Sequence, residues 1–64
     1  MKRISLETAI SEIDNTYDYW KLSEMPEARR CYEQYVECVI FSCKAEARPA
    51  LDTYWNGLKR GVSI

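Results

Sequence analysis

Histidine is absent from this 64-residue chain, and glycine is scarce, with only two residues. Without histidine, general acid–base catalysis loses its commonest agent. The only two glycines, Gly57 and Gly61, both belong to a predicted C-terminal helix and its end, so there is no glycine-rich loop to cradle phosphate groups. These absences argue against an enzyme, and no catalytic residue is predicted.

The chain also lacks an excess of charge of one sign, because nine basic residues face ten acidic ones and the net charge is −1. Such a balance gives no long-range field that attracts nucleic acid or acidic membranes, and it argues against a mimic of DNA, which needs a large negative excess. The acidic residues of the N-terminal third are spread along the sequence without the paired geometry that separates two carboxyl pKa values. They are Glu7, Glu12, Asp14 and Asp18, and we expect them to lie on a solvated face.

Long hydrophobic runs are missing too, since the longest, Val39 to Phe41, falls far short of the ~20 apolar residues of a membrane span. Cysteine is present three times, at Cys31, Cys38 and Cys43. An odd count, and the absence of a signal-peptide pattern after Met1, favour a reducing cytoplasm. Three cysteines without histidine do not make the four ligands of a zinc site. We therefore expect small buried apolar residues, no metal and no cofactor.

Apolar residues make up 47 % of the sequence and aromatic residues 12 %, which is too rich for a disordered chain. Sixty-four residues form one domain, which buries only about 60 % of the surface that its unfolded chain exposes. Ser5 is a suitable N-cap, and the apolar residues that follow recur at spacings of three and four. They are Leu6, Ile10, Ile13, Tyr17 and Trp20, and they predict an amphipathic helix to about Leu22.

A second helix is predicted from Pro26 to about Ala47, because Pro49 biases Arg48 away from the helical region. A third, short helix is predicted at about 50–60, with Gly61 just past its end and 61–64 as a possible flexible tail. The predicted fold is a single all-α domain over 1–64. It consists of an antiparallel helical hairpin (about 5–22 and 26–47) and a short C-terminal helix.

The second predicted helix has an apolar arc of about 200°, wider than the ~100° that one packing partner covers. One band is centred on Tyr35 and comprises Ala28, Cys31, Tyr32, Tyr35, Cys38, Val39 and Ser42. The first helix can cover this band. The other band, Val36, Ile40, Cys43 and Ala47, needs the third helix or a second copy of the chain. We predict self-association as a homodimer through Val36, Ile40 and Cys43.

Phe41 is the one residue that breaks this pattern, because it falls among the charged residues of the opposite helix face. An exposed phenylalanine near Lys44 and Arg48 could anchor a protein partner, or stack on a base while these cations and Arg30 hold phosphate. The alternative is that the helical phase changes after Ser42, or that the third helix covers the ring.

The chain starts with Met1-Lys2-Arg3-Ile4-Ser5, is only 64 residues long, and combines unpaired cysteines and many aromatic residues with no catalytic set. In these features it resembles the small accessory proteins encoded by temperate, lambda-like bacteriophages. The resemblance implies a non-catalytic protein that binds and modulates a bacterial host protein in the host cytoplasm, and it assigns no roles to residues. The alternative function is a small nucleic-acid-binding or nucleoid-associated regulator that uses Arg30, Lys44, Arg48 and Phe41.

Overall fold

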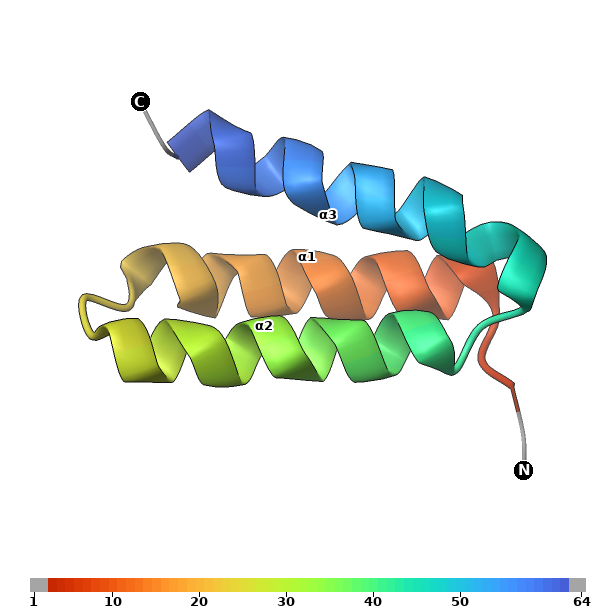
Figure 1. Ribbon diagram of the computed structural model, residues 1–64, viewed down its shortest axis with the longest axis horizontal. Coiled ribbons are helices and arrows are strands. Elements are labelled where there is room, and N and C mark those ends of the chain that lie inside the picture. The colour runs from red at the N-terminus through yellow and green to blue at the C-terminus, as the bar shows by residue number, and fades with distance from the viewer. Residues whose placement is uncertain (1–2, 63–64) are drawn as a thin grey trace.

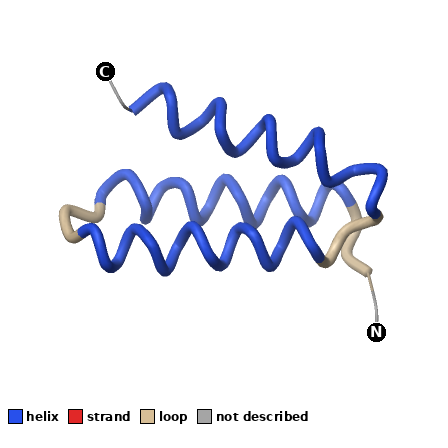
Figure 2. Tube along the Cα trace, in the orientation of Figure 1, coloured by secondary structure: helices blue, strands red, loops and turns tan. Residues whose placement is uncertain are grey.

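The computed structural model describes residues 3–62, apart from the side chain of Val62. All the secondary structure within these residues is helical. Helix α1 spans Leu6–Leu22, α2 spans Pro26–Phe41, and α3 spans Arg48–Val62, with a short 3₁₀ helix, η1, at Ala45–Ala47. Helices α1 and α2 run antiparallel, and α3 returns along them at an angle (Figures 1 and 2). The predicted all-α hairpin with a shorter C-terminal helix is confirmed. None of the described helices is long and apolar enough to cross a membrane.

The limits of α1 agree with the sequence pattern. The side-chain oxygen of Ser5 accepts a hydrogen bond from the backbone N–H of Thr8 at 3.1 Å, which satisfies one of the free N–H groups at the start of the helix. At the other end, the N–H of Ser23 donates to the carbonyl oxygens of Tyr19 and Trp20. Pro26 then starts α2, where its missing N–H leaves no bond unmade.

Helix α2 ends at Phe41, six residues before the predicted end at Ala47, so that prediction is wrong. The N–H and the hydroxyl of Ser42 both donate to the carbonyl oxygen of Cys38, which closes the last turn of the helix. Lys44 is then extended, with φ −60° and ψ 145°. The break turns the chain so that α3 can pack back against the hairpin, a gain in burial that local helix preference does not include.

Helix α3 starts at Arg48, earlier than predicted, and Pro49 lies in its first turn instead of ending the preceding helix. Arg48 has helical angles, φ −57° and ψ −46°, although it precedes proline, so tertiary packing has overcome the local bias. At the other end, Gly61 continues the helix instead of ending it, which contradicts the expected cap and the predicted tail at 61–62. Positions 63–64 of that tail lie outside the described residues.

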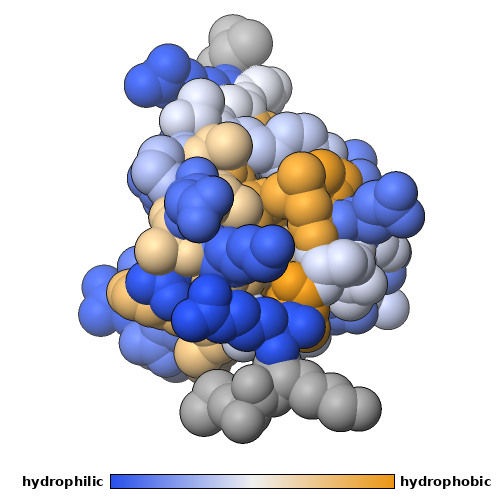
Figure 3. Space-filling view, turned by 90° about the vertical axis from the view of Figure 1, so that its right-hand side faces the viewer, coloured by the Kyte–Doolittle hydropathy of each residue, from blue (hydrophilic) through white to orange (hydrophobic). Residues whose placement is uncertain are grey.

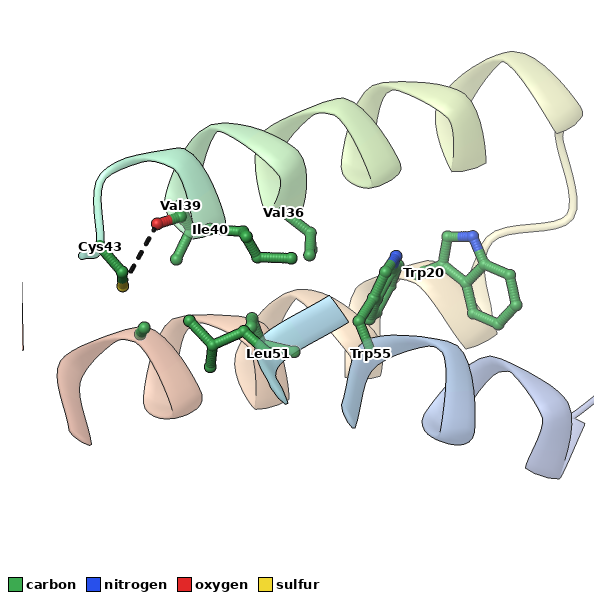
Figure 4. Close-up of a cluster of buried hydrophobic side chains, with 9 residues drawn as sticks. Trp20, Val36, Val39, Ile40, Cys43, Leu51 and Trp55 are labelled. Carbon is green, nitrogen blue, oxygen red and sulfur yellow. Dashed lines mark hydrogen bonds between the residues drawn. The ribbon is translucent and has the colours of Figure 1, made fainter. Parts of the chain in front are cut away.

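Side chains from all three helices form one core (Figure 4). It comprises Ala9, Ile13, Trp20, Val36, Val39, Ile40, Cys43, Leu51 and Trp55. The indole rings of Trp20 and Trp55 meet edge to face with centroids 5.8 Å apart, which joins α3 to the hairpin. The indole N–H of Trp20 donates to a carboxylate oxygen of Glu33 at 2.9 Å, so this buried polar group is paired.

Candidate protein-binding surface

The residues predicted to mediate self-association lie in the core of the single chain. Val36 is fully buried, Ile40 is 7 % exposed and Cys43 is 2 % exposed. They cluster with Ile13 of α1 and Leu51 of α3, so helix α3 covers the band that was expected to need a second copy. The prediction of a dimer through these three side chains is therefore wrong, because they have no free surface to offer.

The predicted partner-binding residues are only partly brought together. Phe41 is 67 % exposed, which excludes the alternative that α3 covers it. The guanidinium of Arg48 lies 5.0 Å from the ring centroid, and its Nη2 donates to the carbonyl oxygen of Phe41 at 3.1 Å. Lys44 is exposed three residues after α2 ends. Arg30 is on α2, eleven residues before Phe41, which is roughly 16 Å along the helix axis, so it lies outside this cluster.

Figure 3 shows the end of the molecule where α2 ends and α3 starts, with hydrophobic side chains beside hydrophilic ones. A hollow of about 420 Å³ opens between the chain before α1 and the turn that follows α2. Its lining residues are Arg3, Ile4, Ser5, Leu6, Cys43, Lys44 and Ala47. Arg48 acts here as a cap for α2, because the hydrogen bond to Phe41 satisfies a carbonyl at the helix end.

Two of the three cysteines contradict the prediction of burial. Cys31 and Cys38 are exposed, and only Cys43 is buried, where its thiol donates to the carbonyl oxygen of Val39 at 3.6 Å. The reason is the phase of α2. The buried stripe is centred on Val36 rather than on Tyr35, which turns the cysteines at 31 and 38 and the tyrosine at 35 toward solvent.

These outward-turned residues belong to a surface that we call the hairpin face, the groove between α1 and α2. It consists of two adjoining hollows of about 450 and 310 Å³, which share Glu12 and Tyr35. The lining residues are Ile4, Thr8, Glu12, Asn15, Thr16, Tyr19, Cys31, Tyr32, Tyr35, Cys38, Val39 and Ser42. On α1, Glu12 and Asp14 lie on opposite sides of the core residue Ile13, and Asp14 contacts Tyr54 of α3. The hairpin face is therefore the flank of the hairpin away from α3.

Three tyrosines dominate this face. The rings of Tyr19 and Tyr32 stack across the two helices with centroids 6.1 Å apart and planes at 21°. Tyr19 is 62 % exposed and Tyr35 is 48 % exposed. The hydroxyl of Tyr35 donates to a carboxylate oxygen of Glu12 at 2.6 Å, and this hydrogen bond raises the pKa of Tyr35 above its usual value.

Charge is distributed unevenly around the face. Of the described residues that line its two hollows, only Glu12 carries a charge, although charged residues make up 30 % of the chain. The hairpin itself is acidic, because α1 and α2 contain seven acidic and three basic residues. Depletion of charge with enrichment of aromatic residues is typical of the buried centre of a protein–protein interface.

The described side chains do not form a cluster of metal ligands. Within residues 3–62, no group of three or more histidine, cysteine, aspartate or glutamate residues could hold a metal ion.

Comparisons with protein-family models, with curated proteins and with solved structures found no match to this chain. The assignment of the hairpin face as a candidate site therefore rests on the geometry of this chain alone.

The sequence pattern missed the hairpin face for an identifiable reason. The pattern places Tyr32, Tyr35 and both exposed cysteines in the band that α1 would cover, and it places Tyr19 off the apolar stripe of the first helix. The signal was nevertheless present, because the apolar arc of the second helix was too wide for one partner. The arc correctly indicated excess apolar surface, but the structure leaves the band around Tyr35 exposed, not the band around Ile40.

Proposed function

We propose that this chain is a non-catalytic helical interaction module that binds another protein through the hairpin face. The observation that carries the proposal is the charge-poor groove with three tyrosines, on the flank of the hairpin that α3 does not cover. Tyrosine supplies a large contact area at a low cost in conformational entropy, because it has few rotatable bonds. Tyr19 and Tyr32 are also held by mutual stacking, which reduces that cost further.

The groove favours a protein over a nucleic acid as the ligand. Phosphate groups need cations, and the only charge in the lining of the described groove is the carboxylate of Glu12. A protein partner can instead place apolar side chains against the tyrosine rings. The resemblance to accessory proteins of lambda-like phages supports a protein of the bacterial host as that partner, met in the host cytoplasm.

A two-site variant pair tests this function. Tyr19→Lys/Tyr35→Lys places two charges in the hairpin face at exposed positions, so the fold is retained. The control, Leu22→Lys/Phe41→Lys, places the same charges at two other exposed apolar positions, 75 % and 67 % exposed. Circular dichroism confirms that both variants are folded before use.

Each form is coupled to a resin and exposed to bacterial lysate, and retained proteins are quantified by mass spectrometry. We expect a host protein that the wild type and the control retain and that the hairpin-face variant loses. Retention by all three forms, or loss from the control alone, contradicts the proposal. The second result would move the binding site to Phe41 or Leu22.

A second candidate function, nucleic-acid binding at the end of the bundle, has one observation in its favour. Phe41 is exposed there, and the exposed residues Lys44 and Arg3 line the hollow beside the end of α2. A mobility-shift titration over salt concentration tests it, because counterion release makes such binding strongest at low salt. A shift at low salt that Phe41→Ala weakens supports this candidate, and no shift at low salt contradicts it.

A further inference from the structure

The length of the hairpin face matches a short helix. Its lining runs from Thr8 to Tyr19 on α1, and from Cys31 on α2 to Ser42, the residue that follows this helix. Eleven residues rise roughly 16 Å in a helix, which is about three turns. A groove between two antiparallel helices accepts the ridge of a third helix, as in a bundle. An occupant of three turns would present apolar residues at positions i, i+3 or i+4, and i+7.

An added strand is a poor occupant of this groove. Both walls are helices, whose backbone N–H and C=O groups bond within the helix, so no open sheet edge is offered by the described chain. Recognition must therefore use side chains, chiefly the rings of Tyr19, Tyr32 and Tyr35. This requirement favours a ligand that presents a row of side chains on one face.

The charge of the groove selects among such helices. Glu12 lies where the two hollows meet, and Tyr35 donates to only one of its carboxylate oxygens. Of the three cations of the hairpin helices, Arg29 is bound to carbonyl oxygens of Trp20 and Ser23, and none of the three lines the groove. The groove therefore presents one fixed anion near its centre, and no cation among the described residues that line it.

A second copy of the chain is a poor occupant of this groove, because its charges do not complement Glu12. Two hairpin faces packed together would bring two Glu12 carboxylates into one apolar interface with no cation in either lining to pair them. Helix α3 of another copy carries Lys59 and Arg60, but its apolar residues Leu51 and Trp55 are already buried in its own core. We infer that the partner's binding segment is a basic amphipathic helix of about three turns, with a lysine or arginine opposite Glu12. This inference rests on the proposed function.

A display library of random 16-residue peptides tests the inference without knowledge of the partner. Peptides are selected on the wild-type protein and counter-selected on Tyr19→Lys/Tyr35→Lys. We expect enriched sequences to carry more lysine and arginine than aspartate and glutamate, with apolar residues at helical spacing. Charge reversal at Glu12 (Glu12→Lys) should weaken a selected peptide about tenfold, because a favourable pair becomes a repulsive one. The control, Glu7→Lys on the outer face of α1, should change affinity less than about twofold.

The outcomes separate the two levels of the proposal. Enriched sequences that are acidic or proline-rich, or equal effects of Glu12→Lys and Glu7→Lys, overturn the basic helix and leave the hairpin face as a binding site. Peptides that bind the wild type and the Tyr19→Lys/Tyr35→Lys variant equally, or no enrichment at all, overturn both. Sedimentation equilibrium that shows a dimer, dissociated by the same variant, assigns the face to a second copy and also overturns the inference.

Discussion

The guanidinium of Arg29 lies over the indole ring of Trp20, 4.6 Å from the ring centroid. Its Nε also donates to two carbonyl oxygens at the end of α1, that of Trp20 at 3.2 Å and that of Ser23 at 2.9 Å. One side chain of α2 thus binds carbonyl groups at and just beyond the C-terminal end of α1, where helical carbonyls lack a full set of partners. The neighbouring Arg30 is exposed, and these two residues form a natural comparison.

Replacing Arg29 with alanine should lower the free energy of unfolding by about 1–3 kcal/mol, because charge-assisted bonds and a contact with an aromatic ring are lost. Arg30→Ala should change it by no more than about 0.5 kcal/mol. Urea denaturation followed by circular dichroism measures both. Equal effects of the two substitutions would show that the hairpin turn does not depend on this cap.

Ile40 and Phe41 are adjacent in sequence but differ in burial, at 7 % and 67 % exposure. Ile40→Ala should destabilise the fold by about 2–5 kcal/mol through the cavity that it leaves in the core. Phe41→Ala should cost about 1 kcal/mol or less, the value of an exposed contact with Arg48. Urea midpoints of the two variants test this. If Phe41→Ala unfolds the domain, its ring has a structural role and is no binding element.

The three thiols should react at different rates, because Cys31 and Cys38 are exposed and Cys43 is 2 % exposed. A thiol reagent added to the native protein should modify two sites quickly, and the third only on unfolding. Mass spectrometry of digested protein identifies the modified positions. Rapid labelling of Cys43 under native conditions would be inconsistent with the packing of α3 over this part of the core.

Tyr35 and Tyr54 have a raised pKa, each chiefly because its hydroxyl donates to a carboxylate, that of Glu12 for Tyr35 and that of Asp14 for Tyr54. Since the neutral phenol is favoured in the folded state, the stability that these bonds contribute is complete below about pH 10, the unfolded pKa. It is lost as the pH rises through the folded pKa. The melting temperature of the wild type should therefore fall more steeply above pH 10 than that of Tyr35→Phe/Tyr54→Phe. Parallel curves would show that these bonds do not persist in solution.

The parts of the fold that depend on neighbours along the chain could be predicted from the sequence alone. Ser5 supplies an oxygen to an N–H three residues away, and Pro26 fits a first helical turn, so α1 and the start of α2 could be placed without tertiary information. The apolar spacing of α1 likewise identified Ile13 and Trp20 as buried. These features are local, and the sequence pattern is enough to predict them.

The end of α2, and the flank of this helix that stays exposed, depend instead on contacts between distant segments. The break at Ser42–Lys44 and the early start of α3 arise because burying Leu51 and Trp55 against the hairpin outweighs the preference of one helix to continue. The position of α3 then covers Val36 and Ile40 and leaves Tyr35 exposed. The apolar arc of a helix indicates how much of its surface must be covered. The packing of distant segments decides which part of the arc is covered, and therefore where the hairpin face lies.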